Sequence, residues 1–290
     1  MELYSNLKEG EKGAWLSIWT YILLSAVKLI IGYIGSSEAL KADGLNNTTD
    51  IIASIAILVG LRIAQKPPDA DHQYGHMRAE TVASLVAAFI MAFVGFQILL
   101  SAGKSIINPV KASPSMLTAV VAILSALVMY LVYRYNLNLS KRIGSEAVRA
   151  AAYDNRSDAL VSVGTAIGIF GAVIGFPIID SITAFIIGLL VILTAWKIFY
   201  PSVHTLTDGF DEEDVEKLSQ LVRRVDGVIK LREIKGRMHG NLMFVDLTVT
   251  VNPKLNVVQS HRITEEIERK IGAKKPHSVI LVHIEPDLTN

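Results

Sequence analysis

The sequence contains no cysteine, and charged residues make up only 19% of its 290 positions. The missing cysteines exclude disulfide bonds and metal sites built on thiolates. Neither a Gly-x-Ser-x-Gly nor a His-Glu-x-x-His stretch occurs, so these hydrolase signatures are lacking and we expect no enzyme. The formal net charge is only +1, and the basic residues form no stripe interleaved with aromatics, so we expect no nucleic-acid partner.

Hydrophobic residues account for 51% of the chain, which is typical of a membrane protein. The first 12 residues are polar and do not resemble a cleavable signal peptide, so we expect the first apolar stretch to remain as an anchor. Stretches of roughly 20 residues are long enough to cross a bilayer as helices. Six such stretches occur, at residues 14–34, 40–63, 81–100, 116–132, 149–174 and 178–199.

The distribution of basic residues predicts the orientation in the membrane. The connections at residues 35–37 and 175–177 contain neither lysine nor arginine, although Lys104 and Lys111 in another connection oppose the trend. By the positive-inside rule we expect a multi-pass protein of the cell membrane with both termini in the cytoplasm. The basic residues of the other side are Lys8, Lys12, Arg62, Lys66, Arg78, Arg134, Lys141, Arg142 and Arg149.

The composition changes after Tyr200 and Pro201, where charged residues become common. We expect residues 1–201 to form a six-helix transmembrane domain and residues 202–290 to form a separate cytoplasmic domain. Helical periodicity follows the acidic run 211–214 and recurs around 263–271, whereas residues 229–235, 245–252 and 279–284 fit strands. The predicted order is αββαβ, a two-layer ferredoxin-like or metallochaperone-like α+β domain that dimerisation or metal could stabilise.

Two pairs of polar residues lie four positions apart inside the apolar stretches. Asn46 and Asp50 occupy the second stretch, and Asp154 and Asp158 occupy the fifth. Since residues four apart share one face of a helix, two such faces could form a cage of four oxygen ligands. An aspartate at the bilayer centre costs roughly 2.5–3.5 kcal/mol, and an interhelical hydrogen bond returns only about 0.6–2 kcal/mol. A divalent cation or a proton relay therefore explains these residues better than helix–helix bonding alone.

The six apolar stretches, the two ligand pairs and the small final domain resemble the cation diffusion facilitator family, whose members are dimeric metal/proton antiporters. Residues 42–50 (ADGLNNTTD) and 74–80 (YGHMRAE) carry the resemblance most specifically. Members that move zinc usually have histidine or aspartate at the position of Asn46, and often histidine at that of Asp154. The set of one asparagine and three aspartates is similar to the manganese-exporting branch.

The chemistry of the ligands also favours manganese(II) as the transported substrate. Carboxylate and amide oxygens suit magnesium, calcium and manganese, whereas imidazole suits zinc, and none of the seven histidines lies in an expected span. Zinc or iron(II) export remains an alternative, as does a passive channel, although a channel would need a filter or a charge ring. Carboxylates crowded in a low-dielectric site should hold protons when metal is absent, so we expect proton exchange and no organic cofactor.

Three further charged residues in the spans have open alternatives. Asp43 lies three positions before Asn46 and could support the ligands from behind or line the access path, or it could start a helix. Asp180 fits a helix cap. Lys28 could pair with an acid or extend towards the membrane surface.

The resemblance implies a peripheral metal site at Asp69, His72 and His76, although a solvated polar loop is the alternative. It also implies an ion pair between Arg78 and Asp208 at the waist of a homodimer, where an ordinary surface pair is the alternative.

In the final domain the resemblance implies a regulatory metal site at His261, His283 and Glu285. A further histidine of the family is replaced by Ile229 here, which puts the two-ion version of that site in doubt. His239 could substitute for it or could be an exposed turn histidine.

Overall fold

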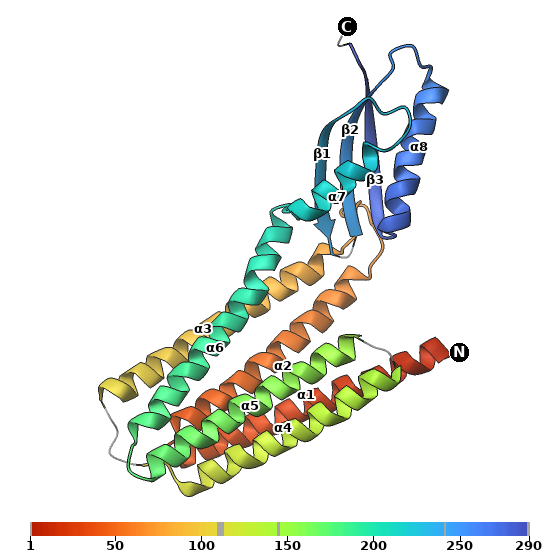
Figure 1. The fold of residues 1–290 in the computed structure, drawn as a ribbon. Coiled ribbons are helices and arrows are strands. Elements are labelled where there is room, and N and C mark those ends of the chain that lie inside the picture. Colours follow the sequence, from red (N-terminus) through yellow and green to blue (C-terminus); the bar gives the residue numbers. More distant parts are fainter. Residues whose placement is uncertain (1, 109–112, 144–145, 241, 289–290) are drawn as a thin grey trace. The chain divides into compact units, whose positions relative to one another are not determined.

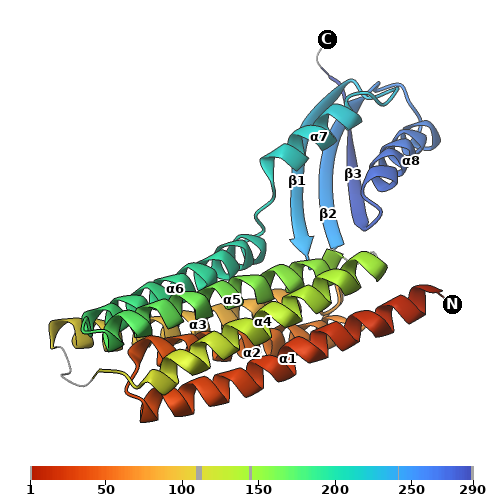
Figure 2. The same ribbon diagram turned by 60° about the horizontal axis from the view of Figure 1, so that its bottom comes forward.

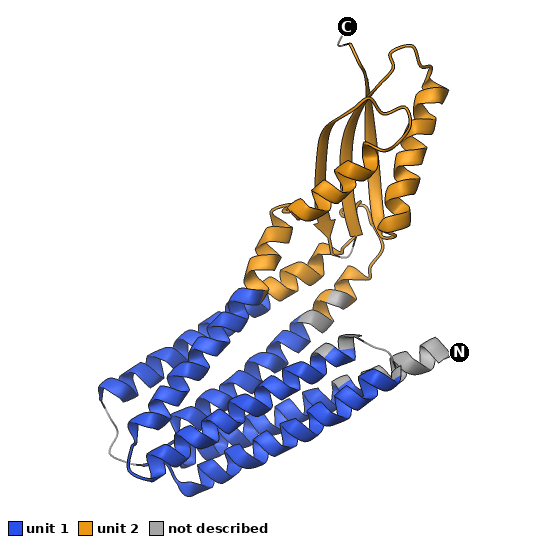
Figure 3. Ribbon diagram, in the orientation of Figure 1, with its two compact units in different colours: residues 1–56, 86–197 blue, residues 57–85, 198–290 orange. Residues whose placement is uncertain are grey.

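The computed structural model describes residues 2–108, 113–143, 146–240 and 242–288, without the side chains of residues 2–12, 14, 57, 58, 61, 143, 146, 147 and 150. Lys111 and the side chains of Lys8 and Lys12 therefore lie outside the described part. The chain divides into two compact units, residues 1–56 with 86–197 and residues 57–85 with 198–290 (Figure 3).

Six long helices run alongside one another through the first part of the chain (Figures 1 and 2). Five of them, α1 and α3 to α6, are long and apolar enough to cross a membrane in their described residues. The sixth, α2, has 27 residues, but its five charged side chains lower its hydropathy. The helices are α1 (Glu2–Ile34), α2 (Glu38–Ala64), α3 (Arg78–Ile107), α4 (Met116–Ile143), α5 (Glu146–Val173) and α6 (Ile178–Leu206).

Small side chains allow the helices of the first unit to pack closely. Ala39 and Leu40 of α2 join a buried cluster with α4 and α5, while Ala42 of the same helix joins another with α3 and α6. Alanines at such contacts let helix backbones approach each other in a membrane. The helix α2 is thus packed on two sides by the rest of the unit.

The first unit places large apolar side chains outside and polar side chains inside. Trp19, Phe93 and Leu160 are more than half exposed, whereas Lys28 and Asp43 are completely buried. A soluble protein rarely exposes such large contiguous apolar surface. Buried ionisable groups in membrane helices usually face the bundle interior and serve function, so the polar interior is where a site is expected.

The second unit contains a three-stranded sheet with two helices on one face. The elements are α7 (Glu212–Val222), β1 (Lys230–His239), β2 (Leu242–Val251), α8 (Val257–Lys274) and β3 (Ser278–Pro286). The sheet order is β1-β2-β3, with β1 antiparallel and β3 parallel to β2. The predicted αββαβ order is therefore confirmed.

Alternating side chains of β2 make the core of this domain. Val245, Leu247 and Val249 are buried against α7 and α8, as their period of two predicts. The helix α8 begins at a capping box, in which Asn256 and Gln259 exchange side-chain-to-backbone hydrogen bonds.

Candidate metal-transport site

Three of the four expected ligands converge inside the first unit. The amide nitrogen of Asn46 on α2 lies 3.3 Å from Asp158 Oδ1 on α5 and 3.5 Å from Asp50 Oδ2. Asp158 is buried, and the other two side chains are half-buried. One amide thus bridges two carboxylates from two helices, which makes a compact group of oxygen atoms.

Asp154 does not join this group. It lies one turn before Asp158 on α5 and is exposed. Among the described residues, the one set of three acidic or histidine ligands within 4.8 Å of one another lies elsewhere. Of the four expected side chains, three therefore converge, and the fourth, Asp154, is exposed on α5.

A tyrosine from a third helix also reaches the group. The hydroxyl of Tyr21 on α1 donates to Asp158 Oδ2 at 2.6 Å, and Asn155 Nδ2 donates to the same hydroxyl at 2.9 Å. Asn155 Oδ1 in turn accepts from Ser17 and Asn136. Both oxygens of Asp158 are thus held by hydrogen bonds, and a buried polar chain continues from the site towards α4.

Sequence reasoning did not identify Tyr21 or Asn155. The spacing of polar residues in the sequence could have identified them. Ser17 and Tyr21 lie four positions apart on α1, and Asn155 lies three positions before Asp158 on α5. Such spacing gives a helix a polar stripe inside an apolar span, and that stripe should face a polar interior.

Lys28 is fully buried in an interior cluster. Its ammonium donates to Asp43 Oδ1 at 2.9 Å, Asn47 Oδ1 at 2.7 Å and Ser162 Oγ at 2.9 Å. The lysine therefore pairs with an acid and does not extend to the membrane surface. Asp43 lies in the second turn of α2 and not at its start, so it serves the interior cluster.

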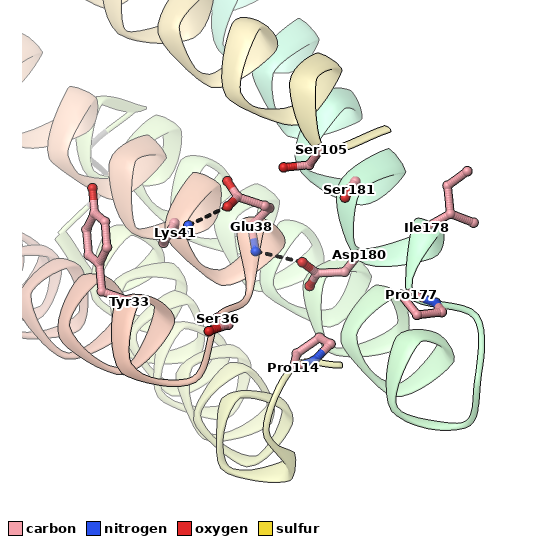
Figure 4. A pocket seen from close by; sticks show the side chains of 10 residues that line it. All are labelled: Tyr33, Ser36, Glu38, Lys41, Ser105, Pro114, Pro177, Ile178, Asp180 and Ser181. Carbon is pink, nitrogen blue, oxygen red and sulfur yellow. Dashed lines mark hydrogen bonds and ion pairs between the residues drawn. The ribbon is translucent and has the colours of Figure 1, made fainter. Parts of the chain in front are cut away.

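Asp180 near the start of α6 caps another helix. Its carboxylate accepts from Ser37 Oγ at 2.7 Å and from the backbone amide of Ala39 at 3.3 Å. It also accepts from the backbone amide of Glu38 at 2.6 Å (Figure 4). These are the free amide groups at the N-terminus of α2, where an anion is stabilising. The sequence predicted a cap, and the structure assigns it to α2.

A pocket of about 180 Å³ adjoins this cap at the end of the bundle where α2 and α6 begin. Figure 4 shows the ion pair between Glu38 and Lys41 beside Asp180. The remaining lining residues are Tyr33, Ser36, Ser105, Pro114, Pro177, Ile178 and Ser181. The pocket therefore combines two acids and one base at one end of the polar interior.

Asp69, His72 and His76 form a compact cluster in the second unit, with ligand atoms all within 4.8 Å of one another. Asp69 Oδ1 accepts from the backbone of His72 at 2.7 Å and of Asp71 at 3.1 Å. These bonds, chiefly the one from His72, hold the pKa of Asp69 below its ordinary value. One carboxylate and two imidazoles could hold a divalent cation.

Arg78 and Asp208 form an ion pair, also within the second unit. Arg78 begins α3, and Asp208 follows α6 in a left-handed conformation. The contact joins the ends of two helices.

The three residues expected to form a regulatory site are not brought together within one chain. His283 and Glu285 lie on the same face of β3, 3.9 Å apart at their closest, while His261 on α8 faces Glu265. Ile280, Val282 and Ile284 of β3 pack into the core against α8. Since alternate residues of a strand face opposite ways, His283 and Glu285 point away from the helix that carries His261.

Ile229 and His239 are the other two positions that the sequence singled out in this domain. Ile229 is half exposed and donates its backbone amide to Thr250. His239 ends β1 and is half-buried beside the ring of Phe244, 5.0 Å between centroids. The expectation of a water-exposed turn histidine there is therefore wrong.

Comparisons with known proteins cover nearly the whole chain. Residues 14–207 match the family described as "Cation efflux transmembrane domain", and residues 210–287 match "Cation efflux protein, cytoplasmic domain". The manganese efflux system protein MneS of Bacillus subtilis is 54% identical over 99% of both chains. The manganese efflux system protein MneP of the same organism is 30% identical over 96% of both chains.

Proposed function

Because the chain belongs to the cation diffusion facilitator family and is thus a divalent-cation efflux transporter and not an enzyme, we propose that it exports manganese(II) in exchange for protons. The observation that carries the proposal is the convergence of Asn46, Asp50 and Asp158 from two helices in a polar interior. The high identity to a protein named for manganese efflux supports the choice of ion.

The proposed metal ligands are oxygen atoms of Asn46, Asp50, Asp154 and Asp158. The side-chain amide of Asn46 flips so that its oxygen, and not its nitrogen, faces the ion. The flip needs little extra space, because the oxygen and the NH2 group of an amide are similar in size. The exposed Asp154 lies towards the start of α5 and completes the set once an ion has entered. Amide and carboxylate oxygens favour manganese over zinc relative to a site with histidine.

Protons replace the metal in the empty site. Asp50 and Asp158 both accept from the amide of Asn46, so the two carboxylates lie close together. Without a cation between them, two ionised carboxylates would repel each other, which favours protonation. Binding of a divalent ion releases protons, and protons arriving from the opposite side release the ion. Tyr21 holds Asp158 in position throughout. The same carboxylates thus couple the two fluxes, as in carriers with one central site.

The protein is a multi-pass membrane protein with a cytoplasmic C-terminal domain, which the match over residues 210–287 supports, and we assign residues 202–290 to this domain. We assign residues 1–201 to transport and place the protein in the cell membrane as a homodimer with both termini in the cytoplasm. The pair of Arg78 and Asp208 then lies at the dimer waist. Asp69, His72 and His76 bind a peripheral ion. His261, His283 and Glu285 are the residues that we assign to a regulatory ion.

Flux measurements in liposomes test the proposal. Purified protein should carry manganese at a rate that saturates with concentration and rises when a pH gradient is imposed. A flux that neither saturates nor responds to pH would indicate a passive channel. Zinc or iron(II) carried faster than manganese would identify the alternative substrate.

A further inference from the structure

The ammonium group of Lys28 is enclosed by three oxygen atoms in the way that a bound metal ion would be. Asp43 Oδ1, Asn47 Oδ1 and Ser162 Oγ lie 2.9, 2.7 and 2.9 Å from Lys28 Nζ. The lysine and both α2 side chains have no exposed surface. Carboxylate, amide and hydroxyl oxygens are also ligands of hard divalent cations. We call Asp43, Asn47 and Ser162 the lysine cage.

The lysine cage repeats the design of the proposed transport site one turn away. In both, α2 supplies an asparagine and an aspartate four residues apart, Asn46 with Asp50 in one and Asp43 with Asn47 in the other. In both, α5 supplies an oxygen, and Ser162 lies four residues after Asp158. The two helices run in opposite directions, so a step of about one turn back along α2 and one turn forward along α5 leads the same way. The lysine cage therefore lies about 5 Å along the bundle from the proposed transport site.

The lysine cage lies between the proposed transport site and the end of the bundle that carries the pocket. On α2, Asp43 and Asn47 lie between the transport site and Glu38, which lines the pocket. That end lies away from the cytoplasm, because α6 begins there and leads into the cytoplasmic domain. An ion that moves outward from Asp50 and Asp158 must therefore pass the level of Lys28.

The lysine cage has unused capacity for a ligand. Asp43 Oδ2 is buried and has no hydrogen-bond partner among the described residues, so one carboxylate oxygen is still available to a cation. A buried ion pair contributes little to stability compared with apolar side chains of similar size, whereas removing one partner leaves a costly buried charge. Packing alone therefore does not explain why this lysine is here.

We propose that Lys28 is a tethered cation that occupies a second divalent-cation site, formed by Asp43, Asn47 and Ser162, and closes it to metal. The covalently attached ammonium fills the oxygen cage, so an ion in the transport site meets a positive charge on its outward path. Removal of the lysine opens the cage to a divalent cation. The inference rests on the proposed function for the direction of export, but the existence of the second site does not.

Manganese binding to the full-length protein tests the inference directly. The background variant carries Asp50→Asn, Asp158→Asn, His72→Ala and His76→Ala, which remove the transport and loop ligands. Adding Lys28→Met to this background should raise the bound manganese by about one ion per protomer in equilibrium dialysis. Adding Lys28→Arg, which keeps a cation in place, should produce no gain. Adding Lys28→Met together with Asp43→Asn should abolish the gain.

A folded Lys28→Met protein that binds no additional manganese would overturn the inference, as would a gain that persists with Asp43→Asn. If Lys28→Met is unstable because Asp43 is left unpaired, manganese should raise its melting temperature and should not raise that of the double variant. An equal shift in both would also overturn it. Failure of the proposed function appears separately, as an absence of manganese flux in wild-type liposomes.

Discussion

Tyr21 on α1 donates a hydrogen bond of 2.6 Å to Asp158 on α5. A third helix thus contacts the proposed transport site, whose proposed ligands come from α2 and α5. A hydroxyl held against one carboxylate oxygen leaves the other oxygen facing Asn46. The orientation of Asp158 is therefore set before an ion arrives, which reduces the cost of assembling the site.

Replacing Tyr21 by phenylalanine should slow manganese transport. A hydrogen bond to a charged group contributes about 1.5–3 kcal/mol, so the rate at limiting manganese should fall by about 10- to 100-fold. Liposome flux at several manganese concentrations measures the effect. Tyr135→Phe is the matched control, because Tyr135 is an exposed tyrosine of α4, and it should transport normally. Equal rates for the two variants would remove Tyr21 from the site.

The two aspartates of α5 should differ in importance. Asp158→Ala removes a carboxylate that two helices hold in place, so we expect manganese flux to fall below detection. Asp154→Ala removes an exposed carboxylate that completes the set later, so the loss should be smaller, about 10-fold. Flux is compared at equal amounts of folded protein, judged by gel filtration. A larger loss for Asp154 would contradict the arrangement of the site.

Replacing Asn46 by histidine should shift the preference from manganese towards zinc. An imidazole nitrogen favours zinc, whereas the amide oxygen that it replaces suits manganese. The ratio of zinc to manganese flux in liposomes should rise, and Asn46→Gln, which keeps the amide, should leave the ratio nearer to wild type. An unchanged ratio in the histidine variant would show that selectivity lies elsewhere.

The turn around Asp69 should survive mild acid. Its pKa is lowered in the folded protein, chiefly by the backbone amide of His72. The bonds to the ionised carboxylate therefore persist above its ordinary pKa of about 3.9 and are lost only as the pH falls through the lower folded value.

Hydrogen exchange of residues 69–76, followed by mass spectrometry against pH, measures this stability. Protection should remain at about pH 4 and disappear below it. Asp69→Ala, which lacks the acceptor, should show low protection throughout. Loss of wild-type protection well above pH 4 would contradict the role of Asp69.

Local patterns in the sequence predicted most of the fold. Apolar length predicted α1 to α6, and alternation in residues 245–251 predicted β2, because both signals lie within a single element. Asp180 shows what a local pattern cannot predict. The sequence indicates that this aspartate caps a helix, but the helix that it caps, α2, is determined by how the helices pack.

The candidate metal sites also depend on packing between elements, which local sequence patterns do not predict. Spacing brought Asn46 and Asp50 to one face, but the turn of α5 that displaces Asp154 depends on packing against other helices. The separation of His261 from His283 follows from which face of β3 meets α8. The family resemblance implied the loop site, and the structure brings the ligand atoms of Asp69, His72 and His76 within 4.8 Å of one another.

The most direct test of the account is the position of manganese in the metal-bound protein, measured by anomalous X-ray scattering at the manganese absorption edge. The account predicts a peak between α2 and α5, coordinated by oxygen atoms of Asn46, Asp50, Asp154 and Asp158. Asp158→Asn should abolish that peak while the fold is kept. A bound ion elsewhere in the six-helix domain, with these side chains uncoordinated, would contradict it.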